Sequence, residues 1–307
     1  MVLSLGALAV VILPIASDRS QNVSLGKQWM TLLKEYPTFS AKPTEYPLDI
    51  NFYYAPPSDD SLRRLRDSYH LEAIAGQGSE TDRIINLMSW VYELAGHANE
   101  PVIPEKRNAT TLIHLATVEQ QDINCYMKTV ILNEVYLAMG FYSRHTHLLP
   151  YSNEEEESHF VTSVYSQTLQ KWILMDPDFG VYVTDDKGNI LGVSEIRSRL
   201  IAGEPLVSVH PTGKGLANAW AGFMNFIEGA DYFWFLSDFI FKIRCPRNSM
   251  FNQDTNIPER EFFELIPDGY REEFLKESKM TARGKKIFFI NDQVLFWQKP
   301  TGSTYEK

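Results

Sequence analysis

The chain has 307 residues, of which 44% are apolar and 13% aromatic, and its net charge is −10. This apolar content is enough for a globular core and excludes intrinsic disorder. The acidic balance argues against nucleic acid as a partner, because nucleic-acid binding requires a basic surface. Two cysteines exclude a disulfide scaffold and a cysteine-rich metal module.

Residues 2–17 contain no charged side chain. The run is shorter than the about 20 apolar residues of a membrane span, and its last positions are small, as in a secretory signal. We therefore expect residues 1–17 to be a signal peptide or N-terminal anchor, with membrane association through this segment only. The protein would be exported, to the periplasm, the cell surface or the medium. A buried first helix is the alternative.

Apolar spacing predicts helices first and strands afterwards. Helices are expected at residues 79–95, which begin with a capping box, and at 110–116, 125–139 and 194–202. Strands are expected at 141–149, 159–165 and 171–175, then a hairpin at 181–191 and strand-like pieces at 232–243, 261–266 and 287–297. The helix at 125–139 is apolar around most of its circumference, so it should be buried at the centre.

No linker composition separates these elements. We expect residues 18–307 to form a single α+β domain. Its catalytic core would span roughly residues 79–200, with an N-terminal wrap at 18–78 and a C-terminal extension at 201–307.

Three residues occupy positions that suit catalysis by a thiol. Cys125 begins the buried helix, where the helix dipole favours a thiolate and the first-turn N–H groups can bind an oxyanion. His159 begins one strand, and Asp176 ends the next. Antiparallel pairing would place these two side by side against the start of the helix, as nucleophile, base and base-orienting residue.

The runs around these residues resemble the transglutaminase-like superfamily of papain-fold proteins. They are Asn124-Cys125-Tyr126, the strand His159–Tyr165, and the segment Lys171–Pro177, which contains Trp172 and ends in Asp-Pro. Ser89-Trp90-Val91, followed by His97, is similar to the helix that precedes the cysteine in these domains. The resemblance covers roughly residues 80–200, and exported members from Bacteroidetes are the most similar.

The resemblance implies a papain-like α+β fold, in which a buried helix headed by Cys125 packs on an antiparallel sheet carrying His159 and Asp176. It implies a thiol-dependent amide hydrolase or acyltransferase that forms a thioester with a peptide, protein or peptidoglycan-type substrate, without a cofactor or metal. The alternative is a catalytically silent binding or scaffold module that uses the same groove.

The chain departs from the family pattern around the cysteine and the histidine. Asn124 and Tyr126 stand where relatives often have Gly and Trp. Val161 and Ser163 stand where relatives often have Trp and Glu. These differences favour hydrolysis over protein cross-linking.

Trp90, Gln120 and Gln121 are candidates for a second oxyanion or substrate contact, because an indole N–H and a side-chain amide can both donate. Core packing is the alternative for Trp90, and solvent exposure is the alternative for each glutamine.

Four further features have an interpretation of their own. His145 and His147 would lie on one face of a strand and could ligate zinc, although no third ligand is evident. Cys245 is expected to be a packed or surface thiol, and a disulfide to Cys125 would contradict catalysis. The aromatic run 232–235 is typical of core but resembles a binding platform. The four glutamates at 154–157 would favour cationic substrates or form a solvated loop.

Overall fold

The computed structural model describes residues 29–40, 50–152, 158–211, 230–255, 260–271, 273, 275, 278–281 and 284–301. The segments expected to be a signal peptide or anchor (1–17) and the acidic run (154–157) lie outside these residues. In the part that is described, no helix is both long and apolar enough to cross a membrane.

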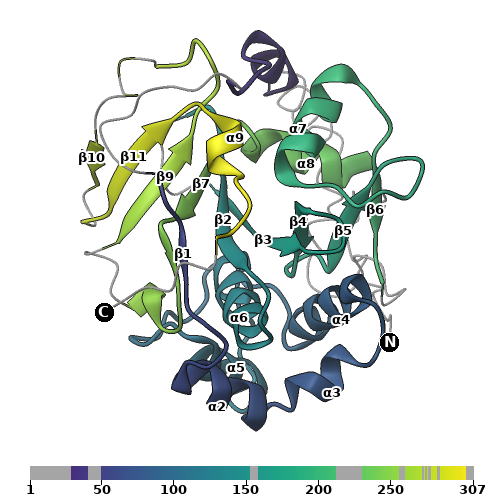
Figure 1. The fold of residues 1–307 in the computed structure, drawn as a ribbon, viewed down its shortest axis with the longest axis vertical. Coiled ribbons are helices and arrows are strands. Elements are labelled where there is room, and N and C mark those ends of the chain that lie inside the picture. The colour runs from purple at the N-terminus through teal and green to yellow at the C-terminus, as the bar shows by residue number, and fades with distance from the viewer. Residues whose placement is uncertain are drawn as a thin grey trace, which may run out of the picture.

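The fold is a mixed α+β arrangement around a large sheet (Figure 1). The helices are α2 (Asp60–Ser68), α3 (Leu71–Ala75), α4 (Glu80–Glu93), α5 (Ala109–Thr117), α6 (Cys125–Ala138), α7 (Val193–Ala202), α8 (Ala230–Phe239) and α9 (Gln293–Phe296). The strands are β1 (Tyr53–Tyr54), β2 (Ser143–Leu149), β3 (His159–Ser166), β4 (Lys171–Asp176), β5 (Val181–Thr184), β6 (Val207–Val209), β7 (Lys242–Pro246), β8 (Asn248–Ser249), β9 (Glu261–Leu265), β10 (Ser278–Met280) and β11 (Lys286–Ile290).

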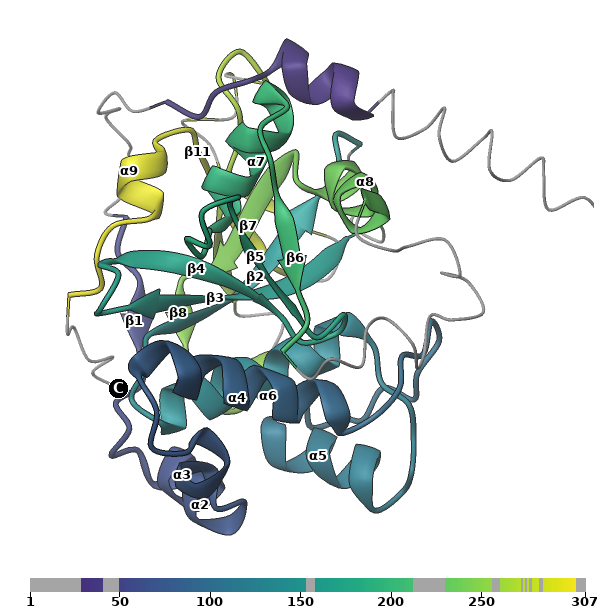
Figure 2. The ribbon, with the colours of Figure 1, turned by 90° about the vertical axis from the view of Figure 1, so that its right-hand side faces the viewer.

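Nine of the described strands form one sheet in the order β10-β11-β9-β7-β2-β3-β4-β5-β6. Neighbours pair antiparallel except β11 and β9, which are parallel. Helix α6 packs on β2 and β3, and α2, α4 and α5 surround α6. Figure 2 shows this helical layer on one side of the strands, with α7 and α8 on the other side. Strands β7, β9, β10 and β11 of the C-terminal part extend the same sheet.

The sequence predicts the central elements closely. The expected capping box starts α4, where Ser79 and Asp82 each bond the other's backbone. The expected buried helix is α6, and twelve of its residues, from Met127 to Ala138, are buried. The predicted strands at 141–149, 159–165 and 171–175 correspond to β2, β3 and β4.

Two predictions in the C-terminal half are wrong. Residues 232–239 are helical rather than extended, because Tyr232, Leu236 and Ile240 recur at a spacing of four and bury one face. The aromatic residues between them suggested a strand by propensity alone. The predicted strand at 287–297 ends at Ile290, where Asp292 caps the short helix α9 by accepting two backbone N–H bonds.

The predicted hairpin at 181–191 forms only its turn. Strand β5 pairs instead with β6, and the expected return strand keeps a single bridge between Thr184 and Ile190. Asp185 shapes the turn because its carboxylate accepts bonds from the N–H groups of Lys187 and Asn189.

A buried arginine joins the N-terminal and C-terminal segments to the sheet. The Arg144 guanidinium carbon lies 3.6 Å from the ring centre of Phe52 and 4.0 Å from that of Trp172. The guanidinium donates to the Tyr54 hydroxyl (2.7 Å) and to the Phe296 carbonyl (2.6 Å). Cation–π contacts and charge-assisted hydrogen bonds therefore fix the segments around Tyr54 and Phe296 against β2 and β4.

Candidate active site

Cys125 heads the buried helix. Asn124 caps α6, with its side-chain oxygen accepting from the Met127 N–H (3.1 Å). The Thr129 hydroxyl contacts the carbonyl of Cys125 (2.8 Å) and that of Phe160 (3.2 Å). This hydroxyl ties the first turn of α6 to β3, one residue beyond His159. Cys125 itself is half-buried and free of any disulfide.

The sheet register brings His159 and Asp176 together. Thr162 of β3 lies opposite Met175 of β4, so Asp176 falls next to the first residues of β3. Side chains alternate between the faces of a strand, and His159 therefore points to the same face as Asp176. The His159 Nε2 atom lies 2.7 Å from the Asp176 Oδ2 atom, and both side chains are buried.

Four donors hold the Asp176 carboxylate in place. Its Oδ1 atom accepts from the backbone N–H groups of Asp178 (3.0 Å) and Phe179 (3.1 Å). Its Oδ2 atom accepts from His159 and from the hydroxyl of Tyr232 on α8 (3.1 Å). A carboxylate can only accept, so Nε2 of His159 carries a proton and Nδ1 is the nitrogen left for the thiol.

The charge state of His159 follows from this contact. Burial on its own disfavours the charged ring, but the Asp176 carboxylate and, after it, the Cys125 thiol outweigh burial and hold the pKa of His159 well above its usual value. The rings of Phe235 (5.1 Å between centroids) and Phe179 (5.5 Å) enclose the imidazole. The aromatic run 232–235 thus forms part of the helix that covers the histidine.

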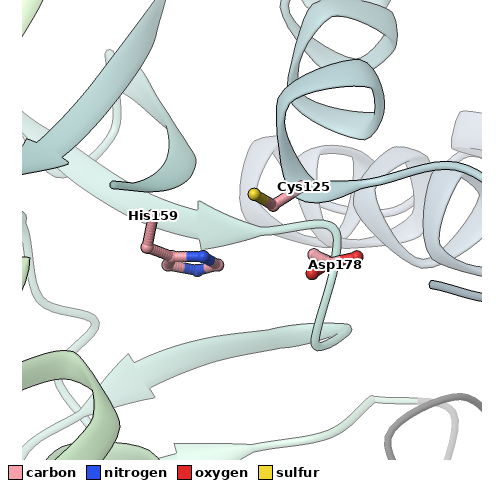
Figure 3. A group of neighbouring side chains, drawn as sticks. All are labelled: Cys125, His159 and Asp178. Atoms are coloured by element: carbon pink, nitrogen blue, oxygen red, sulfur yellow. The ribbon is translucent and has the colours of Figure 1, made fainter. Parts of the chain in front are cut away.

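A second carboxylate lies in the same cluster. Donor atoms of Cys125, His159 and Asp178 all lie within 4.8 Å of one another. Figure 3 shows the thiol at the start of its helix beside the imidazole, with Asp178 on the turn that follows β4.

Asp178 has two cationic or proton-donating neighbours. The His97 Nδ1 atom lies 2.8 Å from one of its oxygens, and the Lys128 Nζ atom lies 3.4 Å from the other. Burial opposes the charge of Asp178, but these neighbours hold its pKa below the ordinary value. Lys128 is itself buried and follows Cys125 by one helical turn.

The candidate oxyanion donors make contacts elsewhere. The side-chain amides of Gln120 and Gln121 are exposed and donate to the nearby carbonyls of Thr117 and Glu119. The half-buried Trp90 ring packs at 6.1 Å from the ring of Tyr69. These contacts give no support to an oxyanion role for the three residues.

The histidines of β2 form no group of three metal-type donors in the described structure, since the group that is found consists of Cys125, His159 and Asp178. His145 and His147 are buried side by side, with ring centroids 4.9 Å apart. The disulfide alternative is also wrong, because both cysteines are free and Cys245 is buried in β7.

Sequence reasoning missed three members of the cluster. Asp178 stands two residues after Asp176, and Lys128 is one of the two charged residues on the largely apolar helix α6. Either feature could have marked its residue as a candidate. Tyr232 lies 56 residues from Asp176 in the sequence, and no local pattern connects the two. His97 was noted only as part of a family pattern.

Comparisons with known proteins add little. No family model matches the chain, and no curated protein matches it. Among solved structures, a cysteine protease candidate from Cytophaga hutchinsonii is similar at 13% identity, with a TM-score of 0.31. The similarity covers 56% of this chain and 57% of that one. The grouped thiol, imidazole and carboxylate fit a thiol-dependent hydrolase in general.

Proposed function

We propose that the chain is a thiol-dependent amide hydrolase or acyltransferase of the transglutaminase-like type, acting on a peptide or peptidoglycan-type amide through a thioester. One observation carries the proposal. A half-buried thiol at a helix start lies within 4.8 Å of an imidazole, and the far nitrogen of that imidazole is 2.7 Å from a buried carboxylate. Nucleophile, base and orienting group thus lie next to one another in the order that acyl transfer requires.

The first half of the reaction forms the thioester. Nδ1 of His159 takes the proton of the Cys125 thiol, and the thiolate attacks the amide carbonyl carbon. A carbon–sulfur bond forms, and the carbonyl electron pair moves to oxygen. The first N–H groups of α6 have no partner inside the helix and would be the donors for this oxygen. Collapse of the adduct breaks the carbon–nitrogen bond, and the His159 imidazolium gives its proton to the leaving amine.

The second half releases the product. His159 removes a proton from a water molecule while the water oxygen attacks the thioester carbon. The carbon–sulfur bond breaks, and the thiolate regains the proton from the imidazolium. An amine in place of water would give a new amide by the same sequence. We favour water because Val161 and Ser163 replace the groove residues that cross-linking relatives often carry.

Export belongs to the proposal as well. The uncharged run at residues 2–17 motivates it. An extracellular or periplasmic location would bring the enzyme to peptidoglycan-type amides.

The test is the alkylation rate of Cys125 by iodoacetamide as a function of pH. Cys245 contributes little background, because burial raises the pKa of its thiol to about 11, and a Cys245→Ala background removes it. We expect rapid alkylation near pH 6.5, where an ordinary thiol of pKa about 8.5 is almost wholly protonated. His159→Ala should abolish this reactivity, and the exposed His114→Ala should leave it unchanged.

A screen of peptide anilides and muropeptides with the intact chain and Cys125→Ala completes the test. Hydrolysis that requires Cys125 supports the enzyme. A thiol that is not alkylated, or whose alkylation rate does not change in His159→Ala, contradicts the enzyme proposal. The catalytically silent binding module in the same groove then remains.

A further inference from the structure

Asp178 is the one member of the cluster that acyl transfer does not use. Asp176 already orients the imidazole, yet a second buried carboxylate lies within 4.8 Å of both the thiol and the ring. Its side chain is fully buried, and His97 and Lys128 hold it in place. These two partners offset the cost of burying its charge, but they do not account for a second carboxylate beside the nucleophile.

We propose that Cys125, His159 and Asp178 form a Zn²⁺ site, and that occupancy by zinc switches the thiol off. The binding of the metal depends only on the three donor atoms. Its inhibitory effect rests on the proposed function, because zinc would occupy the sulfur and the ring nitrogen that acyl transfer needs.

The donor set matches zinc better than other common divalent cations. Thiolate and imidazole are ligands that zinc prefers, whereas Mg²⁺ and Ca²⁺ prefer oxygen alone. Zinc–ligand bonds of about 2.0–2.3 Å in a tetrahedron separate the ligand atoms by roughly 3.4–3.6 Å. The donor atoms of Cys125, His159 and Asp178 lie within 4.8 Å of one another. Side-chain movements of about 1 Å therefore bring them to the separations that zinc requires.

Partners behind the ligands are already in place. In zinc sites a ligating histidine usually donates its other N–H to a carboxylate, which fixes the tautomer and raises the basicity of the ligand. Asp176 has this relation to His159, at 2.7 Å from Nε2. His97 has a similar relation to Asp178, at 2.8 Å. Both ligands are therefore oriented before any metal arrives.

Charge balance points the same way. With a thiolate at Cys125, the cluster contains three anionic groups, counting Asp176 and Asp178. The buried cation beside them is Lys128. A dication bound to a neutral His159 compensates the remaining negative charge. The half-exposed Cys125 leaves the fourth position open toward solvent for a water ligand, as in open zinc sites.

Cobalt titration of the full chain tests the site directly. Co²⁺ replaces zinc in tetrahedral sites and gives a visible spectrum, and a bound thiolate adds a charge-transfer band in the near ultraviolet. After dialysis against a chelator, we expect one Co²⁺ per chain with both signals, and displacement of Co²⁺ by Zn²⁺. Cys125→Ser should remove the charge-transfer band.

Matched carboxamide variants assign the oxygen ligand. Asp178→Asn should weaken Co²⁺ binding at least tenfold, and Asp176→Asn, behind the histidine, by about 10- to 100-fold. The exposed Asp186→Asn should change nothing. Thermal unfolding of each variant establishes that it is folded. A spectrum without the thiolate band, or an affinity unchanged in Asp178→Asn, overturns the site.

Alkylation separates this inference from the proposed function. Zinc at one equivalent should protect Cys125 from iodoacetamide; a bound metal that leaves the alkylation rate unchanged overturns the inhibitory role. If the metal binds through these ligands but the metal-free thiol shows no dependence on His159, the zinc site stands and the proposed enzyme fails.

Discussion

Two neighbouring strands carry buried histidines whose protonation is driven in opposite directions. In β2, His147 pairs with Phe160 of β3, and the next residue, Leu148, pairs with His159. Burial lowers the pKa of His145, and burial together with neighbouring cations lowers that of His147 well below its usual value. The pKa of His159, equally buried, is raised well above its usual value.

The difference lies in what else the nearby carboxylate contacts. Asp176 pairs with His159 at 2.7 Å, and its other bonds come from N–H groups and a hydroxyl. Asp254 lies 3.6 Å from Nδ1 of His145, but it also pairs with the Arg260 guanidinium. Burial therefore outweighs the Asp254 carboxylate, which still raises the pKa of His145, because the Arg260 guanidinium acts in the opposite direction.

Among the described residues, the difference is that the carboxylate beside His159 has no ion pair with an arginine or lysine, and the carboxylate beside His145 has one. By this criterion His159 suits catalysis, and His145 and His147 are packed core residues. The contrast can be tested from either side, by removing the anion from one region or the cation from the other.

The largest effect is expected from Asp176→Asn. The amide oxygen can still accept from His159, but the negative charge that favours the imidazolium is lost. Amide hydrolysis should fall by about 10⁴-fold, as is typical when the orienting carboxylate of a triad is replaced. The rate of hydrolysis and the alkylation of Cys125 near pH 6.5 both measure this loss.

Asp186→Asn makes the same chemical change on an exposed turn and serves as the control. If Asp176→Asn hydrolysed the amide at a rate within tenfold of the unmodified chain, Asp176 would act only on the fold.

Acid stability tests the β2 histidines. A histidine whose folded pKa is lowered stays neutral in the folded state and takes up a proton on unfolding below about pH 6.5. The folded state therefore loses up to about 1.4 kcal/mol per pH unit for each such histidine. His159, with a raised pKa, is protonated in both states in this range and adds no slope; its contribution declines only as the pH rises above 6.5.

His147→Phe isolates one proton. The charged groups that face His147 are His145 on the same strand and the cations Lys285, Arg244 and Arg260, and the three cations do not titrate here. Other groups with raised pKa values, such as Asp238 at about 7, cancel in the difference between chain and variant. Urea unfolding at pH 6.5 and 5.5 should show the variant gaining about 1 kcal/mol relative to the unmodified chain, because the unfolded histidine is half protonated at pH 6.5 and about nine-tenths protonated at pH 5.5. An equal gain in the exposed His114→Phe would contradict the assignment.

The sequence predicts the parts of this contrast that depend on local spacing. The start of α6 at Cys125 follows from apolar spacing and the capping Asn124, and the strands that carry His159 and Asp176 follow from alternation. Nothing local distinguishes a carboxylate that pairs with arginine from one that does not. Asp254 is 109 residues from His145, so the sequence left a zinc interpretation of His145 and His147 open.

Helix α8 was missed for a different reason. Aromatic residues suit both strands and buried helices, and their strand propensity was given more weight than the spacing of four between Tyr232, Leu236 and Ile240. The oxyanion candidates Trp90, Gln120 and Gln121 were chosen by donor chemistry alone. Donor chemistry does not specify direction, so their oxyanion role stays a prediction; the two amides bond nearby carbonyls, and the indole packs on Tyr69.

Removing the competing cation should make His145 resemble His159. Arg260→Gln leaves Asp254 with an uncompensated charge 3.6 Å from Nδ1 of His145. The pKa of His145 should rise by about one pH unit, at the low end of the effect of a nearby opposite charge. NMR titration of the imidazole protons measures it.

Arg247→Gln, which removes a different, half-buried arginine that pairs with Glu261, is the matched control. An unchanged titration of His145 in Arg260→Gln would show that burial alone governs this histidine.

The smallest effect separates two equivalent tyrosine contacts. Tyr232 donates to Asp176 and Tyr126 donates to Asp254, each at 3.1 Å. Either substitution by Phe should lower the free energy of unfolding by about 1 kcal/mol, the net value of one hydrogen bond. Only Tyr232→Phe should also slow amide hydrolysis, by about fivefold. Without the tyrosine hydrogen bond, the Asp176 carboxylate stabilises the His159 imidazolium more strongly, and the imidazolium gives its proton less readily to the leaving amine. Equal rates in the two variants, measured at the same pH with both proteins folded, would mean that Tyr232 supports α8 and has no part in positioning the carboxylate.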